Sequence, residues 1–319
     1  MSGGARLAAV TGATGFLGRY IVRALADDGW TVRILARRDP SHPFWRGIEP
    51  QVVLGDLGDA AALARLCDGA DAVIHAAGLI KARSRVEFDA VNLAGVQQML
   101  GAAPDKAHVL LVSSLAAREP QLSDYAASKR AGEDALIASG RGRFTIVRPP
   151  GVYGPGDRET LALFQAARSW PVLPLLDPAA RTPLIHAADA AAQIAAFAAR
   201  EPDGATWALS DARPDGYAWR EIMAALAASV GRTPRYAAVP GAGLALAGAF
   251  SELAAGLSGR APIFTRGKAR EFLHPDWSIA PAEQASHLPP PRFGLAEGFA
   301  ATAAWYVAEG WLQQSPSSS

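Results

Sequence analysis

Short apolar runs alternate with longer amphipathic stretches through the first half of the chain. The runs are rich in valine, isoleucine and leucine, which is typical of strands covered on both faces of a parallel sheet. We expect strands at 6–10, 31–36, 51–55, 72–77, 108–114 and 143–149, and helices at 16–28, 59–68, 85–103 and 123–139. The alternation predicts an α/β domain with a doubly wound parallel sheet.

The composition of the sequence changes after residue 154, where proline and glycine become frequent. Helical patterns dominate there, at 158–169, 187–200, 217–230, 242–257, 265–272 and 295–309. We therefore expect the doubly wound domain to cover 1–154 and a smaller, mostly helical substrate lobe to cover 155–319, with a cleft between them. Residues 182–210 are predicted to return to the first domain, because the run at 206–210 could add a strand to its sheet.

A glycine-rich turn follows the first predicted strand and opens the first predicted helix. Gly12, Gly15 and Gly18 are spaced G-x-x-G-x-x-G in the segment TGATGFLG. Glycine permits a tight turn and lets the backbone approach a pyrophosphate at the amino end of a helix. In this strand–turn–helix context the motif predicts a dinucleotide site rather than a turn without a ligand.

The end of the second predicted strand bears on which dinucleotide binds. NAD-binding domains commonly place an acid there to hold the ribose 2′-hydroxyl. This chain has Ala36, Arg37 and Arg38 instead. Because a guanidinium binds phosphate through a planar fork, the pair favours the 2′-phosphate of NADP, unless both arginines are merely solvated. We predict NADP, with NAD as the alternative because Asp39 lies close by.

Tyr125 and Lys129 lie four residues apart in the segment YAASKRAGED. On a helix they would share a face, so the ammonium would favour the phenolate and lower the tyrosine pKa. Such a pair could act as a general acid or base. The alternative is an ordinary surface pair, so the motif needs support from the rest of the chain.

The overall composition narrows the classes of function. The 319 residues are 50% hydrophobic and 19% charged with a net charge of +1, which gives no support to disorder or to nucleic-acid binding. The single cysteine, Cys67, excludes a disulfide within the chain and fits a reducing compartment. The six histidines show no metal-ligand spacing, so no metal is expected. With no signal-peptide pattern, we expect a cytoplasmic protein.

The longest apolar stretch, at 241–257, is near the lower length limit for a membrane span and carries Glu252. We therefore predict no transmembrane helix. The stretch could be a core helix, a wall of the substrate pocket, or a helix that makes peripheral contact with a membrane. The rarity of large exposed apolar patches favours the core helix.

Together these segments resemble the extended branch of the short-chain dehydrogenase/reductase superfamily, the NAD-dependent epimerase/dehydratase group. The matching motifs occur in family order: TGATGFLG at 11–18, GDL at 55–57, HAAG at 75–78, VSS at 112–114, YAASK at 125–129 and RPPGVYGPGD at 148–157. The resemblance implies a dinucleotide-binding Rossmann domain over 1–154. Residues 265–277 and 294–311 resemble the dihydroflavonol-reductase and 3β-hydroxysteroid-dehydrogenase-like members.

The resemblance implies a role for each matching residue. Tyr125 would be the catalytic acid or base. Lys129 would lower its pKa and hold the nicotinamide ribose, and Ser114 would bind the substrate oxygen, with Ser113 as the competing candidate. The cofactor would lie against Gly12, Thr14, Gly15, Phe16, Leu17, Gly18, Arg37, Arg38, Asp56, Leu57, Ala76, Ala77, Ser113, Lys129, Pro149 and Val152.

Four further matches carry supporting roles in the resemblance. His75 would line the cofactor rather than bind a metal, and Asn92 would support a helix or a water path. His186 and Asp189 match a segment that returns to the sheet, which indicates a structural role. The resemblance also implies a homodimer that pairs the helices at 85–103 and 123–139.

The predicted function is an NADP-dependent oxidoreductase that interconverts a ketone and a secondary alcohol on a small, apolar substrate. One alternative is an NAD-dependent nucleotide-sugar epimerase or dehydratase, which Arg37 and Arg38 and the lack of an evident sugar-nucleotide clamp disfavour. The other is a non-catalytic nucleotide-binding scaffold. Ser114 and Tyr125 are only eleven residues apart, a short spacing also found in such scaffolds, but an intact Ser-Tyr-Lys set argues for an enzyme.

Overall fold

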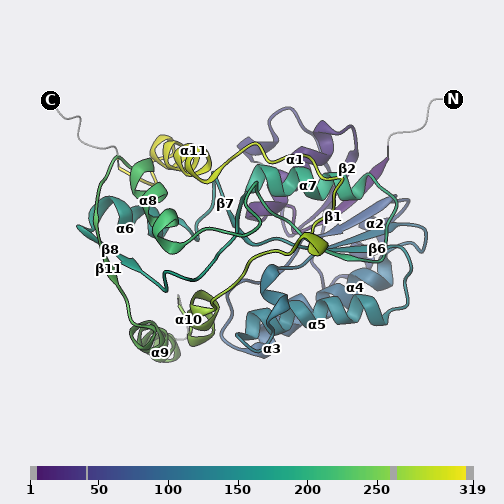
Figure 1. The fold of residues 1–319 in the computed structure, drawn as a ribbon. Helices are drawn as coiled ribbons and strands as arrows, with labels where there is room; N and C mark the ends of the chain where they lie inside the picture. Colours follow the sequence, from purple (N-terminus) through teal and green to yellow (C-terminus); the bar gives the residue numbers. More distant parts are fainter. Residues whose placement is uncertain (1–5, 41, 259–263, 314–319) are drawn as a thin grey trace.

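The computed structural model describes residues 6–40, 42–258 and 264–313, and its centre is a seven-stranded parallel sheet (Figure 1). The strands, in sheet order, are β10 (Thr206–Ala208), β6 (Phe144–Arg148), β5 (His108–Val112), β4 (Ala72–His75), β1 (Leu7–Thr11), β2 (Thr31–Ala36) and β3 (Gln51–Leu54). The order reverses between β4 and β1, and open sheets of this kind bind ligands outside the carboxyl ends of the strands at that point. The predicted doubly wound α/β fold is confirmed.

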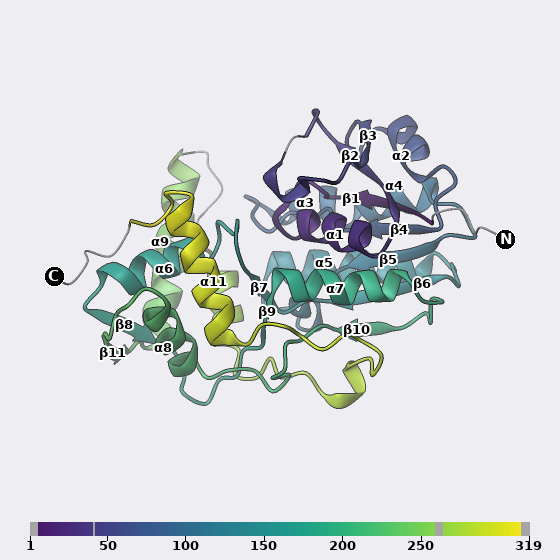
Figure 2. The ribbon, with the colours of Figure 1, turned by 90° about the horizontal axis from the view of Figure 1, so that it is seen from above.

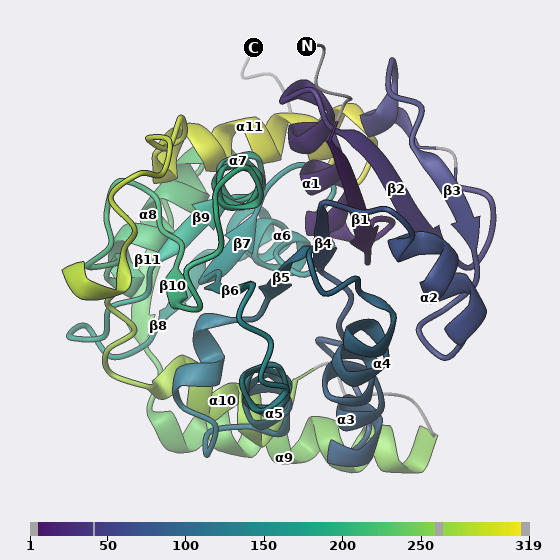
Figure 3. The ribbon, with the colours of Figure 1, turned by 90° about the vertical axis from the view of Figure 1, so that its right-hand side faces the viewer.

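Helices cover both faces of the sheet, as the view in Figure 3 shows. One face carries α1 (Phe16–Asp27) and α7 (Ala187–Ala198), and the other carries α2 (Ala60–Cys67), α4 (Ala94–Ala102) and α5 (Asp124–Ala138), with α3 (Arg85–Asn92) packed against α5. Fully buried Ile21 and Ile194 pack on the first face, and Leu66 and Met99 on the second. Burial of each such side chain stabilises the fold by about 1.5–3 kcal/mol.

The C-terminal lobe lies beyond the carboxyl ends of the central strands (Figures 1 and 2). Its helices are α6 (Leu161–Ser169), α8 (Trp219–Ser229), α9 (Gly241–Ser258), α10 (Arg266–Leu273) and α11 (Leu295–Ala308). A separate apolar core, with Tyr153, Phe164 and Tyr306 fully buried, holds α6, α8 and α11 together. Among the helices of the described ranges, none combines the length and the apolarity that crossing a membrane requires.

Several local expectations need correction. The stretch predicted as one helix over 85–103 is two helices that meet at Leu93. Two short parallel strand pairs were not predicted: β7 (Gly151–Tyr153) with β9 (Leu184–His186), and β8 (Val172–Leu175) with β11 (Arg235–Ala238). All four strands are short and lie close to prolines, so no continuous or alternating apolar run marks them in the sequence.

Two later elements lie against the large sheet and its helices. Helix α7 packs against α1, and β10 pairs with β6 at the edge of the large sheet. The proposed domain boundary at residue 154 stays a prediction.

A buried ion pair connects α5 to the sheet. The carboxylate of Glu133 is 2% exposed and accepts two hydrogen bonds from Arg148 at the end of β6, Nε to Oε1 at 2.9 Å and Nη2 to Oε2 at 2.6 Å. Such a forked pair fixes the distance and the rotation of the helix relative to the strand. It lies one helical turn beyond Lys129 and therefore helps to set where that side chain stands.

We predict that Arg148→Met lowers the free energy of unfolding by about 3–5 kcal/mol, because it leaves the Glu133 carboxylate buried and unpaired. Glu133→Leu combined with Arg148→Met should restore most of that loss. The control is Arg130→Met, which breaks an exposed pair with Asp134 on the same helix and should cost at most about 1 kcal/mol. Urea denaturation measures all three, and a double variant as unstable as the single one would contradict the account.

Candidate active site

The glycine-rich turn after β1 is closed so tightly that side chains would not fit. Gly12 has a positive φ of 72°, and a Cβ there would overlap the backbone of Ala76 and Ala77. A Cβ on Gly18 would overlap the Gly12 carbonyl, so α1 packs directly on the turn. Gly15 precedes α1 and provides no side chain to cap it, which leaves the first amide groups of the helix facing outward. This backbone cradle fits the pyrophosphate of a dinucleotide.

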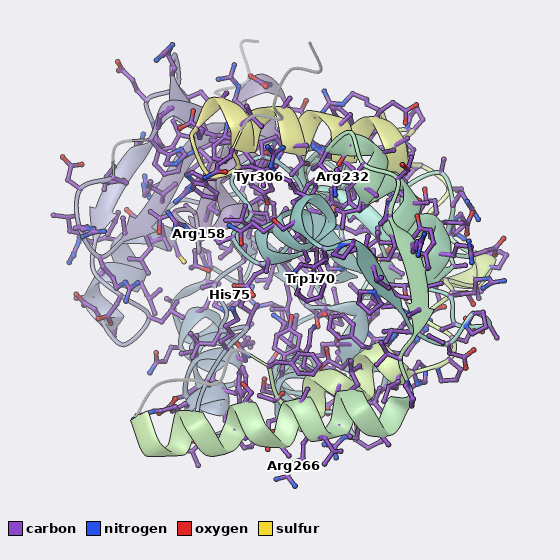
Figure 4. All side chains as sticks on the ribbon, turned by 90° about the vertical axis from the view of Figure 1, so that its left-hand side faces the viewer. His75, Arg158, Trp170, Arg232, Arg266 and Tyr306 are labelled. Carbon is purple, nitrogen blue, oxygen red and sulfur yellow. The ribbon has the colours of Figure 1, made fainter. Side chains whose placement is uncertain are left out.

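His75, which Figure 4 labels, lies directly behind the turn and is fully buried. Its Nδ1 shares a hydrogen bond of 2.9 Å with the Thr11 hydroxyl, and its Nε2 has no partner among the described residues. Burial, and then the charge of Lys129, lower the pKa of His75 to about 3, so the ring is neutral at physiological pH. A neutral, buried ring of this kind supports the floor of the site.

Four predicted cofactor residues stand at the carboxyl ends of β2 and β3, next to the turn. Arg37 and Arg38 are exposed and have no hydrogen bond or ion pair to the described part of the chain. The Asp56 carboxylate accepts a hydrogen bond from Gly58 N at 2.8 Å, and Leu57 is half-buried. Both arginines are thus available to an anion that approaches this edge of the sheet.

A cleft of about 1490 Å³ runs from the turn to the C-terminal lobe. Pockets for a single drug-sized ligand measure about 300–1,000 Å³, so this cleft has room for a dinucleotide and a substrate together. Most of the predicted site residues line it: Gly12, Gly15, Phe16, Leu17, Gly18, Ala76, Ser113, Ser114, Tyr125, Lys129, Pro149 and Val152. The remaining ones do not line this cleft: Thr14, Arg37, Arg38, Asp56, Leu57 and Ala77.

Ser114, Tyr125 and Lys129 come together in the middle of this cleft. Ser114 begins a short 3₁₀ helix, η2 (Leu115–Arg118), and Tyr125 lies in the first turn of α5, where its ring packs near Phe88. The Ser114 hydroxyl interacts with the Tyr125 phenol, whereas the buried Ser113 hydroxyl has no partner among the described residues. Ser114 is therefore the better placed of the two serines to share a substrate oxygen with Tyr125.

The pKa values correct one expectation. Burial raises the pKa of Tyr125 to about 12; the Ser114 hydroxyl acts against this rise, and the charge of Glu271 adds to it. The Lys129 ammonium donates a hydrogen bond to the Val112 carbonyl, with Nζ and O 2.8 Å apart. Burial lowers the pKa of Lys129 itself to about 8, although Glu133 partly offsets the effect. The phenol is thus protonated at neutral pH and can donate a proton.

Asn92, His186 and Asp189 hold the surrounding loops. Asn92 accepts from Leu79 N at 2.8 Å and donates to the Ser128 hydroxyl at 2.8 Å, which fixes the loop after β4 to α5. His186 caps α7, and the buried Asp189 accepts from the backbone of residue 293 at 3.0 Å. These contacts give all three residues structural positions beside the cleft.

The C-terminal lobe supplies an apolar wall that no sequence motif announced. Its side chains are Leu163, Trp219, Ile222, Phe264, Phe272 and Phe299. They come from α6, α8, the segment before α10, α10 itself and α11. The helical patterns of these segments predict a buried face, but not that part of this face borders a cleft.

Comparison with known proteins gives the same architecture. The family model described as "NAD dependent epimerase/dehydratase family" matches residues 8–208. The chain is 52% identical over 305 residues to "Ceramide reductase" of Caulobacter vibrioides (strain NA1000 / CB15N), covering 95% of each chain. It is 31% identical to the "4-hydroxy-2-methyl-3-oxo-4-farnesyl-3,4-dihydroquinoline-1-oxide ketoreductase" of Stigmatella aurantiaca, over 46% of this chain and 51% of that one.

Solved structures share the fold at low identity. "Crystal structure of gox2253" superposes with a TM-score of 0.75 at 19% identity, covering 97% of this chain and 99% of that chain. DesIV, a dTDP-glucose 4,6-dehydratase from Streptomyces venezuelae with NAD and TYD bound, gives 0.71 at 24% identity with 97% and 99% coverage. At these identities the likeness shows the fold alone.

We predict that Gly18→Ala weakens dinucleotide binding at least tenfold and destabilises the protein by about 1–3 kcal/mol, because the added methyl forces α1 away from the Gly12 carbonyl. Fluorescence titration with NADPH and urea denaturation measure the two effects. In the control, Gly101→Ala, the methyl meets open space within α4 and should stabilise the protein by about 0.5–1 kcal/mol. If Gly18→Ala bound NADPH as tightly as the wild type, the glycine-rich turn would not be part of the cofactor site.

Proposed function

Because the chain belongs to the NAD-dependent epimerase/dehydratase family, we propose that it is an NADPH-dependent reductase that converts the ketone of a ceramide-like lipid to a secondary alcohol. The observation that carries the proposal is the convergence of Ser114, Tyr125 and Lys129 on one cleft. The glycine-rich turn bounds this cleft at one end and the apolar wall of the lobe at the other. The 52% identity to a ceramide reductase over nearly the whole chain supports this choice of substrate class.

In a ketone reduction, each of the residues around the cleft would have a separate role. A bound nicotinamide supplies the hydride that reaches the carbonyl carbon. Ser114 donates a hydrogen bond to the ketone oxygen, and Tyr125 gives that oxygen its proton. The C=O double bond becomes a C–O single bond, with one new C–H bond and one new O–H bond. Lys129 holds the nicotinamide ribose, and its charge stabilises the phenolate left on Tyr125 until solvent reprotonates it.

The protonation of Tyr125 supports the reductive direction. Because its pKa is raised to about 12, the phenol carries its proton throughout the physiological range. An acid must start a reduction in that form, whereas oxidation of an alcohol needs the phenolate. Because the pKa of Lys129 is about 8, its ammonium is largely charged below that pH and is available to stabilise the phenolate that forms when Tyr125 gives up its proton.

The apolar wall suits a substrate with long hydrocarbon chains. A ceramide carries a secondary hydroxyl beside its amide-bearing carbon, and the corresponding ketone would present its oxygen to Ser114 and Tyr125. Trp219, Ile222 and Phe299 could then contact the chains. The apolar wall favours the lipid over a nucleotide sugar, whose diphosphate would have to depend on the arginines and lysines elsewhere along the cleft.

Arg37 and Arg38 support NADPH over NADH. They stand free at the end of β2, where the adenosine ribose lies in this fold. Their guanidiniums can neutralise the 2′-phosphate. The homodimer and the cytoplasmic location expected from the sequence stay predictions.

The reductase proposal predicts that the purified protein reduces an N-acylated 3-ketosphingoid base with NADPH, with the alcohol detected by mass spectrometry. Tyr125→Phe should lower kcat by about 10²–10⁴-fold while the affinity for NADPH stays within twofold, because only the proton donor is lost. Tyr236→Phe, which alters a lobe tyrosine outside the cleft, should keep its activity. A fully active Tyr125→Phe variant would refute the assignment of the acid.

The cofactor proposal predicts that Arg37→Ala and Arg38→Ala each weaken NADPH binding about 10–100-fold, the usual loss for a charged hydrogen bond, and leave NADH binding unchanged. Energy transfer from tryptophan to the reduced nicotinamide reports both affinities. Arg46→Ala changes another exposed arginine and should have no effect. An unaltered ratio of the two affinities would show that the arginines do not read the 2′-phosphate.

A further inference from the structure

The segment between Ser114 and Tyr125 is short and is held from far along the chain. Arg118, at the end of η2, donates a hydrogen bond to the Ser278 carbonyl at 2.8 Å and pairs with Glu283 at 3.3 Å. Both partners lie about half the chain length away in sequence. The loop that carries the candidate catalytic serine to the candidate catalytic tyrosine is therefore anchored by the C-terminal part of the molecule.

Helix α10 holds the two residues that precede α5. Arg270 Nε donates to the Leu122 carbonyl at 2.7 Å, and the Ser123 hydroxyl donates to the Glu271 carboxylate. Gly267 allows this approach, because a Cβ there would lie 2.8 Å from the Ser123 Cβ. Three residues of one helix thus converge on Leu122 and Ser123, which lie just before the start of α5.

Glu271 is the buried centre of these contacts. Its residue exposure is 6%; one carboxylate oxygen accepts from Ser123, and the other accepts from Lys268 Nζ at 2.9 Å. Ser123 also caps α5, because its Oγ accepts from Ala126 N at 2.9 Å. A carboxylate that orients a capping hydroxyl fixes the first turn of the helix, and Tyr125 lies in that turn.

We propose that Glu271 is a positioning residue: through Ser123 it fixes the first turn of α5 and so places the Tyr125 phenol toward the substrate oxygen. The role of Tyr125 in this statement rests on the proposed reductase function, whereas the coupling of Glu271 to the start of α5 does not. Helix α10 also supplies Phe272 to the apolar wall of the cleft. The substrate lobe therefore completes the site in two ways, since it lines the pocket and holds the acid.

The charge of Glu271 has a separate consequence for pH. The charged residues of α5, α10 and the segment before α3 that line the cleft with Tyr125 are Asp124 and Lys129, then Arg266, Lys268, Arg270 and Glu271, and finally Arg83. The Glu271 charge raises the Tyr125 pKa, in addition to burial. Removing the Glu271 charge should therefore lower the Tyr125 pKa.

Three substitutions separate position from charge. Glu271→Gln keeps an oxygen for the Ser123 hydroxyl but removes the charge, Ser123→Ala keeps the charge but removes the hydroxyl, and Glu271→Ala removes both contacts. We expect Glu271→Ala and Ser123→Ala each to lower kcat at least tenfold, with the NADPH affinity within twofold. Their double variant should be no slower than the slower single one, because the two residues act as one unit. Glu271→Gln should keep kcat within threefold at pH 7 and shift its alkaline limb to lower pH.

Hydrogen exchange measured by mass spectrometry over 123–130 needs no substrate. Glu271→Ala should exchange faster there than the wild type, because the cap on Ala126 is loosened. The control is Glu119→Gln, which removes a carboxylate that accepts a hydrogen bond from Gln121 in the same loop. This variant should change neither kcat nor the exchange over 123–130. If the wild type reduces no ketone while Glu271→Ala still speeds exchange over 123–130, the proposed reductase function is refuted, and the coupling of Glu271 to the start of α5 is supported.

Two results would overturn the positioning role. One is a double variant whose loss of kcat is the product of the losses in Glu271→Ala and Ser123→Ala, and the other is a Glu271→Ala variant whose exchange over 123–130 equals that of the wild type. If Glu271→Ala does not fold, Glu271→Asp decides: it keeps the charge but shortens the reach to the Ser123 hydroxyl, so faster exchange over 123–130 supports the proposal and unchanged exchange overturns it.

Discussion

The hydrogen bond from the Lys129 ammonium to the Val112 carbonyl organises the site. Val112 ends β5, the central strand that leads to Ser114, and Lys129 lies one helical turn after Tyr125 on α5. This contact of 2.8 Å joins the helix to the strand end at the point where all three side chains meet. The contact has an electrostatic cost, since burial lowers the pKa of Lys129 to about 8, and the nearby Glu133 carboxylate recovers part of it. Glu133 in turn is held by Arg148, so the charge on Lys129 is supported through a chain of buried partners.

The two parts of the molecule contribute differently to this arrangement. The parallel sheet provides backbone: the glycine-rich turn, the amino end of α1 and the strand ends form a site for the dinucleotide without side chains of special shape. The lobe provides side chains: an apolar wall for a substrate, and α10, which holds the start of α5 through Arg270 and Glu271. Sheets of this kind keep the cofactor end constant while the lobe sets the substrate, which is how one fold can accommodate many reactions.

The sequence predicts the large sheet well because most of its strands are continuous apolar runs separated by helical patterns. The same reasoning fails where structure depends on distant partners. Strand β7 is three residues long, begins next to two prolines and pairs with residues 184–186, so no local pattern marks it. The i, i+4 spacing correctly places Tyr125 and Lys129 on one helix, but burial, which the spacing does not report, raises the tyrosine pKa instead of lowering it.

Glu271 could not be found from sequence, since it reaches Ser123 across 148 residues. The exposed Arg37 and Arg38 lie where the strand pattern puts them, yet their role depends on a ligand.

The central claim is that this cleft passes a hydride to a ketone carbon of a lipid while the chain supplies the proton. Isotope transfer tests it most directly. The wild-type protein would be incubated with NADPH carrying deuterium at the transferable C4 position and with an N-acylated 3-ketosphingoid base, and the alcohol would be analysed by mass spectrometry. The account predicts one deuterium in the product, located on the carbon that bears the new hydroxyl. An alcohol without deuterium, or cofactor oxidation without an alcohol product, would contradict it.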